Sequence, residues 1–190
     1  MDGIAWAASA MEAARSRLDI ATQNLANVST DGFARRVARG ALTALGARVA
    51  AVVSSERGSL RRTGRPYDLA ILGSGAFRVR DARGAIVATR AGSFAVDRDG
   101  HLRDASDRIL LDGKDRPIAV DARQRPDERS LGAAIGATVR SGVLETSAVD
   151  QISEMIDVLT AQRSYEGAEK IIAAIDATRE KSVDDVARLK

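Results

Sequence analysis

The chain has 190 residues, of which 45% are hydrophobic and only 3% aromatic, so it can bury one sizeable core built chiefly from small aliphatic side chains. It contains no cysteine, which excludes disulfides and thiolate metal sites, and no stretch approaches the roughly 18 apolar residues of a membrane-spanning helix. The formal net charge of +3 is spread over mixed signs along most of the chain, so it does not by itself indicate a nucleic-acid partner.

The N-terminal segment has the clearest periodicity and predicts a helix that begins near Ile4 and ends near Asn27. Large apolar residues recur every seven positions, and small ones recur in phase three positions later: Ile4, Met11, Leu18 and Leu25, then Ala7, Ala14, Ala21 and Val28. This is the a/d pattern of a coiled coil, although an amphipathic helix on a globular core has similar spacing. Turn-forming residues follow, and Asn27 suits a left-handed C-cap. The start lacks a basic region before an apolar block, so we expect no cleavable secretory signal.

The next segment, residues 35–66, is basic and is predicted to be a connection. Between Arg35 and Arg65 there are eight arginines and a single acid, Glu56. A nucleic-acid-binding segment usually also presents stacking aromatic residues, and none lies between Phe33 and Tyr67. We therefore interpret the segment as a solvated arginine-rich surface and expect no nucleic-acid partner.

Residues 67–140 predict a small antiparallel β domain, because apolar residues now alternate with a period of two. We expect one hairpin from strands at 77–79 and 86–88, with its turn at 81–84. A second hairpin pairs 94–96 with the strand that begins at Leu102, and Gly100 in its turn should have a positive φ. Two further short strands are expected at 109–111 and 118–120, followed by a polar loop over 121–129.

A second long helix is predicted at the C-terminus, with Ser147 as N-cap and Asp150 three residues later. Its apolar row is Val149, Ile152, Ile156 and Leu159, and after a polar middle it resumes at Ala168, Ile171, Ile172 and Ile175. We expect one continuous helix, with a possible bend at Gly167.

Candidate active-site patterns do not reach the requirements of known chemistry. The single histidine, His101, has no cysteine with which to form a zinc site, and a triad with Ser93 and Asp99 lacks the G-x-S-x-G nucleophile elbow. In the EF-hand register of Asp97 and Asp99, Ser106 stands where a bidentate carboxylate is needed. We therefore predict no catalytic residue, no cofactor and no metal site.

Several motifs closely resemble those of the flagellar rod and hook protein family. The first is NLANVSTDGF at 24–33, which matches N-x-A-N-x-x-T-x-G-F/Y in spacing and composition. The middle of the chain contributes TGRPYDLAILGSGAFRV at 63–79 and TRAGSFAVDRDGHL at 89–102. Near the C-terminus, SGVLETSAVD at 141–150 and EMIDVLTAQRSYEGAEKIIAAID at 154–176 complete the family's order. Ala76 and Ala148 depart from its usual aromatic and Asn, and short connections suggest a reduced member.

The resemblance implies an α+β structural subunit of the bacterial flagellar basal-body rod. Terminal helices within 1–34 and 141–190 would pair as a coiled-coil inner layer, and the β domain at 67–140 would lie outside it. The implied partners are copies of the chain, other rod and hook subunits and the flagellar type III export apparatus, with no membrane insertion. A soluble oligomeric adaptor or a basic surface-binding helical protein is the alternative.

The residues that we expect to serve assembly, from the heptads and from the family motifs, are the following: Ile4, Met11, Leu18, Asn24, Leu25, Asn27, Thr30, Gly32, Phe33, Leu144, Glu145, Ser147, Glu154, Met155, Gln162, Arg163 and Tyr165.

Overall fold

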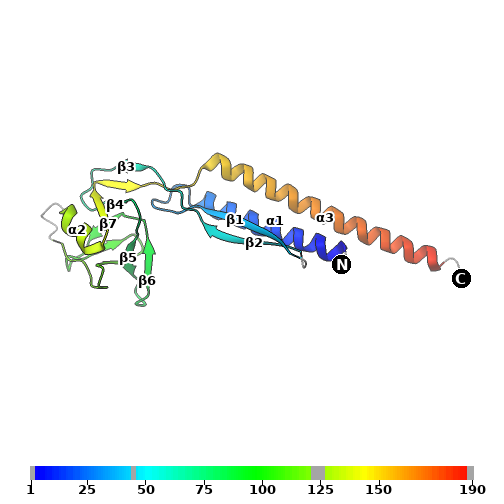
Figure 1. The fold of residues 1–190 in the computed structure, drawn as a ribbon, viewed down its shortest axis with the longest axis horizontal. Coiled ribbons are helices and arrows are strands. Elements are labelled where there is room, and N and C mark those ends of the chain that lie inside the picture. Colours follow the sequence, from blue (N-terminus) through cyan, green and yellow to red (C-terminus); the bar gives the residue numbers. More distant parts are fainter. Residues whose placement is uncertain (1–2, 44–45, 121–126, 188–190) are drawn as a thin grey trace. The chain divides into compact units, whose positions relative to one another are not determined.

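The computed structural model describes residues 3–43, 46–120 and 127–187 (Figure 1). The chain divides into two compact units, each made of segments that are distant in sequence. Unit 1 comprises residues 1–26, 36–54 and 150–190, and unit 2 comprises residues 27–35 and 55–149. Helices at both ends and antiparallel strands between them confirm the predicted α+β class.

Unit 1 contains the two long helices, α1 (Gly3–Ala26) and α3 (Gln151–Ala187), which lie side by side (Figure 1). A hairpin of β1 (Arg36–Thr43) and β2 (Gly46–Val53) packs along α1. The Ala47 N–H donates to the Ser9 hydroxyl on α1 at 3.2 Å. Among the described residues, no helix has both the length and the apolar run that a membrane crossing requires.

Helix α1 ends at Ala26, close to the predicted end, but its cap differs from the prediction. The left-handed non-glycine residues among those described are Asp107 and Asp115, so Asn27 does not take the left-handed conformation. Asn27 instead forms a turn in which its carbonyl accepts the Thr30 N–H at 3.1 Å. The left-handed residue of this connection is Gly32, with φ of 70°.

Helix α3 begins at Gln151, and its N-cap is Asp150, not the predicted Ser147. The Asp150 carboxylate accepts the N–H groups of Ile152 and Ser153, at 2.8 and 3.2 Å. These are the bonds that an N-cap supplies to the first helical turn. Ser147 lies in the segment before the helix, where its hydroxyl accepts the Val149 N–H at 3.3 Å. The helix continues unbroken through Gly167.

The segment that we predicted as a connection contains β1, β2 and β3 (Leu60–Arg62). In β1 and β2, residues pair in register from Arg36 with Val53 to Thr43 with Gly46. The Ala and Val residues of this segment suit strands, but its eight arginines favoured the interpretation of a solvated surface.

The main sheet of unit 2 has five strands in the order β6-β5-β9-β8-β7. Their bounds are β5 Phe77–Arg80, β6 Ile86–Thr89, β7 Phe94–Val96, β8 Leu102–Asp104 and β9 Ile109–Leu111. Both predicted hairpins are confirmed by the pairing of β5 with β6 and of β7 with β8. Gly100 has the predicted positive φ, at 80°.

Several elements of unit 2 differ from the sequence prediction. Residues 118–120 form no strand: within them only Ala119 makes an isolated bridge, to His101, and Pro117 just before them makes another, to Leu111. The expected loop over 121–129 is followed instead by a short helix, α2 (Glu128–Ile135), capped by Asp127; residues 121–126 lie outside the described part. Strands β10 (Thr138–Ser141) and β11 (Val143–Glu145) pair with β4 (Leu69–Leu72) and β3.

The core of unit 2 lies between these strands and α2. Phe77 and Phe94 meet edge to face, with ring centroids 5.3 Å apart. The buried apolar residues of this cluster are Leu69, Ile71, Phe77, Val79, Phe94, Leu102, Leu110, Ile118, Leu131 and Val139. Fully burying a side chain of this size stabilises the fold by about 1.5–3 kcal/mol relative to exposing it. Unit 2 therefore has its own hydrophobic core.

Candidate assembly surface

The contact between α1 and α3 is made by small side chains. The predicted alanine row of α1 is buried, with Ala7, Ala14 and Ala21 at 2–6% exposure, and α3 contributes the buried Ala161 and Ala168. The large row of α1 is only half-buried at each position: Ile4, Met11, Leu18 and Leu25. Alanine at the contact lets two helices approach closely, which leaves the larger row at the edge of the pair.

A buried polar pair crosses this helix contact. The Asn24 amide donates to the Glu154 carboxylate at 3.1 Å, and both side chains are 1% exposed. Asn24 also bonds both backbone groups of Arg36, accepting its N–H at 2.9 Å and donating to its carbonyl at 2.7 Å. One side chain thus fixes α3 and the first residue of β1 against α1. A buried polar pair of this kind favours one register of two helices.

The second half of NLANVSTDGF forms a tight connection within unit 2. The Gly32 N–H donates to the Glu145 carbonyl at 2.7 Å, and the Phe33 carbonyl accepts the Ala148 N–H at 3.0 Å. A Cβ at Gly32 would lie 2.3 Å from the Arg90 carbonyl carbon, and its positive φ also favours glycine. Both properties explain why glycine stands at this position.

Arg90 joins several segments of this region through its guanidinium group, and it was not among the predicted assembly residues. Its guanidinium pairs with the buried Glu145 carboxylate at 2.7 Å and donates to the Ile71 carbonyl at 2.9 Å. It also donates to the carbonyls of Gly73, at 3.3 Å, and Gly75. The signal in the sequence was the arginine of TRAGSF, in the short connection between β6 and β7 that also contains Gly92.

The predicted assembly residues fall into three groups by exposure. The buried ones are Asn24, Leu144, Glu145 and Glu154. The half-buried ones are Ile4, Met11, Leu18, Leu25, Asn27, Gly32, Phe33, Ser147 and Tyr165. The exposed ones are Thr30, Met155, Gln162 and Arg163. Within unit 1, a groove of about 620 Å³ is lined by Leu18 and Gln162 together with Thr22 and Val158, so it joins predicted residues from both helices.

The first part of the apolar row predicted for α3 does not face α1, whereas in its second part Ala168 is buried and Ile175 lies against Gly3 of α1. Ile152 is 72% exposed, Ile156 58% and Leu159 56%, and Met155 beside them is 46% exposed. The heptad row of α3 that is buried consists of Glu154, Ala161 and Ala168. The sequence showed an apolar stripe, but it could not show which protein surface covers it. Contiguous exposed apolar side chains of this kind mark interaction sites.

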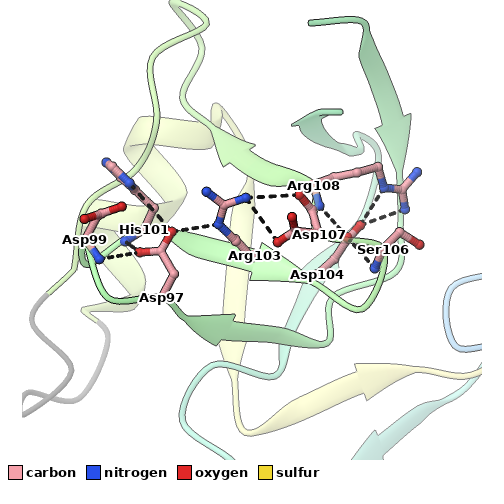
Figure 2. Close-up of polar contacts among 8 residues, drawn as sticks. All are labelled: Asp97, Asp99, His101, Arg103, Asp104, Ser106, Asp107 and Arg108. Carbon is pink, nitrogen blue, oxygen red and sulfur yellow. Dashed lines mark hydrogen bonds and ion pairs between the residues drawn. The ribbon is translucent and has the colours of Figure 1, made fainter. Parts of the chain in front are cut away.

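Four turns of unit 2 have the same hydrogen-bond pattern, in which the carboxylate of an aspartate accepts the backbone N–H groups of the residues two and four positions later. Asp97 accepts those of Asp99 and His101 at 2.9 and 2.8 Å, as Figure 2 shows. Asp81, Asp104 and Asp112 repeat the pattern. Arg103 bonds the other oxygen of Asp97 at 2.7 Å (Figure 2). Carboxylate oxygens of Asp97 and Asp99 lie within 4.8 Å of a His101 nitrogen, but this cluster already has a structural role in the turn.

We expect unit 2 to lose stability in acid because of these turns. The Arg103 hydrogen bond holds the pKa of Asp97 below its ordinary value of 3.8, and the Arg116 N–H does the same to the pKa of Asp112. A carboxyl with a lowered folded-state pKa stabilises the fold above its unfolded pKa. That contribution is lost as pH falls from about 4 through the lower folded-state pKa.

The urea concentration at the midpoint of unfolding should therefore stay high from pH 7 to about pH 4 and fall as the pH is lowered further to 2.5. The Asp97→Asn, Asp112→Asn double variant should have a smaller drop over the same interval. An equal pH dependence in the variant would contradict this role of the two carboxylates.

Comparison with known proteins identifies the chain's relatives. Three family models match in order: "Flagella basal body rod protein" over residues 4–33, "Flagellar hook protein FlgE/F/G D1 domain" over 70–154 and "Flagellar basal body rod FlgEFG protein C-terminal" over 140–184. Together they cover both terminal helices and the main β region.

Individual relatives agree with the family models. The flagellar basal-body rod protein FlgG of Agrobacterium fabrum is 28% identical over 251 aligned positions, which cover 93% of this chain and 96% of the relative. FlgF of Mesorhizobium japonicum is 32% identical over 143 positions, covering 70% of this chain and 59% of the relative. The hook protein FlgE of Escherichia coli is 34% identical over 103 positions, 50% of this chain and 26% of the hook protein. This chain belongs to the flagellar basal-body rod protein family.

Proposed function

We propose that this chain is a structural subunit of the flagellar basal-body rod that assembles with copies of itself through its terminal helices. The observation that carries the proposal is the exposed apolar row of α3: Ile152, Met155, Ile156 and Leu159. Four large apolar side chains on neighbouring turns gain about 25 cal/mol per Å² when another surface covers them. In a protein that builds a tube, further subunits would cover such a row.

Within a subunit, we infer that α1 and α3 pair as a coiled coil and form the inner layer of the rod. The buried heptad of Ala7, Ala14 and Ala21, opposite Ala161 and Ala168, supports this pairing. Helices α1 and α3 would supply this inner layer; residues 27–34 and 141–149, which the sequence analysis assigned to it, belong to unit 2. The subunit would transmit torque mechanically and catalyse no reaction.

We infer that the other partners are rod and hook subunits, because relatives of this chain are named as such. Delivery would use the flagellar type III export apparatus. Neither nucleic acid nor insertion into a membrane has a part in this proposal.

Replacing Ile156 with aspartate should abolish motility and rod assembly while the fold is retained. Ile156 is 58% exposed in the single subunit, so aspartate costs the isolated fold little. Burying an unpaired carboxylate between subunits would cost several kcal/mol, which is more than a hundredfold in assembly. The measurement is swimming in a strain that lacks the gene, complemented with each variant, together with isolation of basal bodies.

Ile86→Asp is the matched control, because Ile86 is also exposed, at 42%, but lies on β6 of unit 2. It introduces the same chemical change outside the helices. If Ile156→Asp supports normal swimming, the α3 row is not an assembly surface and the proposal is wrong.

A further inference from the structure

The β1–β2 hairpin presents an exposed basic face. Arg39 pairs with Ala50 and Arg48 pairs with Ala41 in the hairpin register. Residues directly opposite in an antiparallel pair share a face, as do residues two apart in one strand, so Arg39 and Arg48 lie diagonally on one face. Both side chains are exposed, and residues 36–53 contain no acidic residue.

These two arginines have no partner among the described residues, as no hydrogen bond or ion pair joins either of them to another side chain. Arg36, by contrast, donates to the Gln23 amide oxygen at 3.0 Å. An exposed acid, Glu12, lines a cavity of about 390 Å³ together with Arg48, but it forms no ion pair with that arginine. Among the described residues, no carboxylate is therefore paired with Arg39 or Arg48 in a single copy.

Helix α3 has the opposite charge. Between Gln151 and Ala187 it has eight carboxylates against four basic residues, whereas the hairpin has three arginines and no acid. Four exposed carboxylates follow a heptad spacing on one flank of the helix: Glu166, Glu169, Asp176 and Glu180. We call this row the acidic stripe. In the described part of the chain, the carboxylates of these four residues make no hydrogen bond or ion pair.

We propose that the basic face of the hairpin in one copy binds the acidic stripe of α3 in a neighbouring copy. The proposal rests on the proposed function and adds a second contact, separate from the apolar row. The spacings agree: diagonal residues of a hairpin stand about 7–8 Å apart, and Glu166 and Glu169, three residues apart on a helix, about 5–6 Å. Long arginine side chains span this difference and can bind carboxylates bidentately.

A second copy is the fitting partner because both complementary surfaces are on this chain and neither is used within it. The hairpin packs along α1, which leaves its arginines exposed. Two different patches that bind each other between copies make a heterologous contact, which repeats along an open helix unless it closes into a ring. That is the symmetry of a rod.

The test reverses the charges separately and then together. The variants are Arg39→Glu with Arg48→Glu, Glu166→Arg with Glu169→Arg, and all four changes combined. The measurement is the protein concentration at which the purified full chain forms sedimentable rods in 50 mM salt. Each double variant should need at least about tenfold more protein than the wild type. The combined variant should return to within about threefold of wild type, because it restores opposite charges.

The matched control is Arg83→Glu with Arg98→Glu, which makes the same charge change at exposed arginines of unit 2. Far-ultraviolet circular dichroism checks that every variant keeps its helices. Rods formed by Arg39→Glu, Arg48→Glu at the wild-type concentration would overturn this inference alone. A combined variant that is folded but still needs about tenfold more protein than the wild type to form rods would also overturn it.

A different result would contradict the proposed function. If the wild-type chain remains monomeric at every concentration, both proposals are wrong. A hairpin variant that assembles normally but no longer binds heparin would assign the basic face to a polyanion and overturn the contact between copies. Raising the salt to 500 mM should weaken wild-type assembly, because screening acts on exposed ion pairs.

Discussion

Replacing Gly92 with alanine is expected to unfold much of unit 2. A Cβ at this position would lie 1.6 Å from the Leu69 carbonyl oxygen and 3.2 Å from the Phe77 ring. The obstacle is backbone, so it cannot move aside as a flexible side chain would. Gly92 also accepts the Leu69 N–H at 2.8 Å, and the residues that follow it lead into β7.

To accept the methyl group, the chain at Leu69 and Gly92 must separate, which weakens the core contact between Phe77 and Phe94. We expect a loss of about 3 kcal/mol or more in the free energy of unfolding. Urea denaturation, followed by the circular dichroism of the β strands, measures this loss of free energy. Gly113→Ala is the control, because its Cβ would meet only the Ala134 carbonyl oxygen, at an ordinary 3.5 Å. Equal midpoints for the two variants would show that the close approach at Gly92 is not required.

Replacing Asn24 with alanine should produce the largest loss of stability within unit 1. The change removes three hydrogen bonds: one to the Glu154 carboxylate and two to the backbone of Arg36. Glu154 is 1% exposed, so its carboxylate would lose a donor without gaining water. Hydrogen bonds to charged groups contribute about 1.5–3 kcal/mol each, and we expect a total loss of about 3 kcal/mol.

Glu154→Gln is the informative companion, because glutamine keeps an acceptor for Asn24 without a buried charge. It should therefore cost less than Asn24→Ala. Thermal unfolding monitored at 222 nm, which reports mainly the helices of unit 1, gives both values. A variant Asn24→Ala that melts like the wild type would mean that the polar pair does not hold the helices together.

Local chemistry explains which parts of the fold could be predicted from sequence. The alanine heptad of α1 is buried as its period predicts, since a seven-residue repeat places those residues on one side of a helix whatever the partner. The hairpin turns were predictable because Asp and Gly have few alternatives: Gly84 and Gly100 both adopt a positive φ. In each case, the residues concerned are close in sequence.

The incorrect predictions depend on contacts between distant residues. Ser147 and Asp150 are equally good N-caps by type, but residues before the helix are engaged elsewhere: the Ala148 N–H with Phe33 and the Thr146 N–H with Ser59. Strands β1 and β2 are different, because they pair locally with each other; their arginines favoured the interpretation of a solvated surface and hid the strand pattern.

The candidate site divides in the same way. The motifs pointed to Asn24, Glu145 and Glu154, which the structure places in buried polar contacts. Arg90 was not predicted because its partners come from two parts of the chain that are distant from it in sequence: the Glu145 carboxylate and the carbonyls of residues 71–75. Ile152, Ile156 and Leu159 are exposed because no other segment that the structure describes covers them in one copy. The periodicity of the sequence does not contain this information.

Oxidation of Met155, before and after concentration of the protein, tests the central claim most directly. Met155 belongs to the α3 row and is 46% exposed, and the chain has only two other methionines, Met1 and Met11. Hydroxyl-radical footprinting with mass spectrometry can follow its sulfoxide in each state. If the α3 row packs between subunits of a rod, Met155 should be oxidised in the dilute monomer and protected several-fold once rods form. Equal oxidation of Met155 in both states would contradict an account in which this row is the assembly surface.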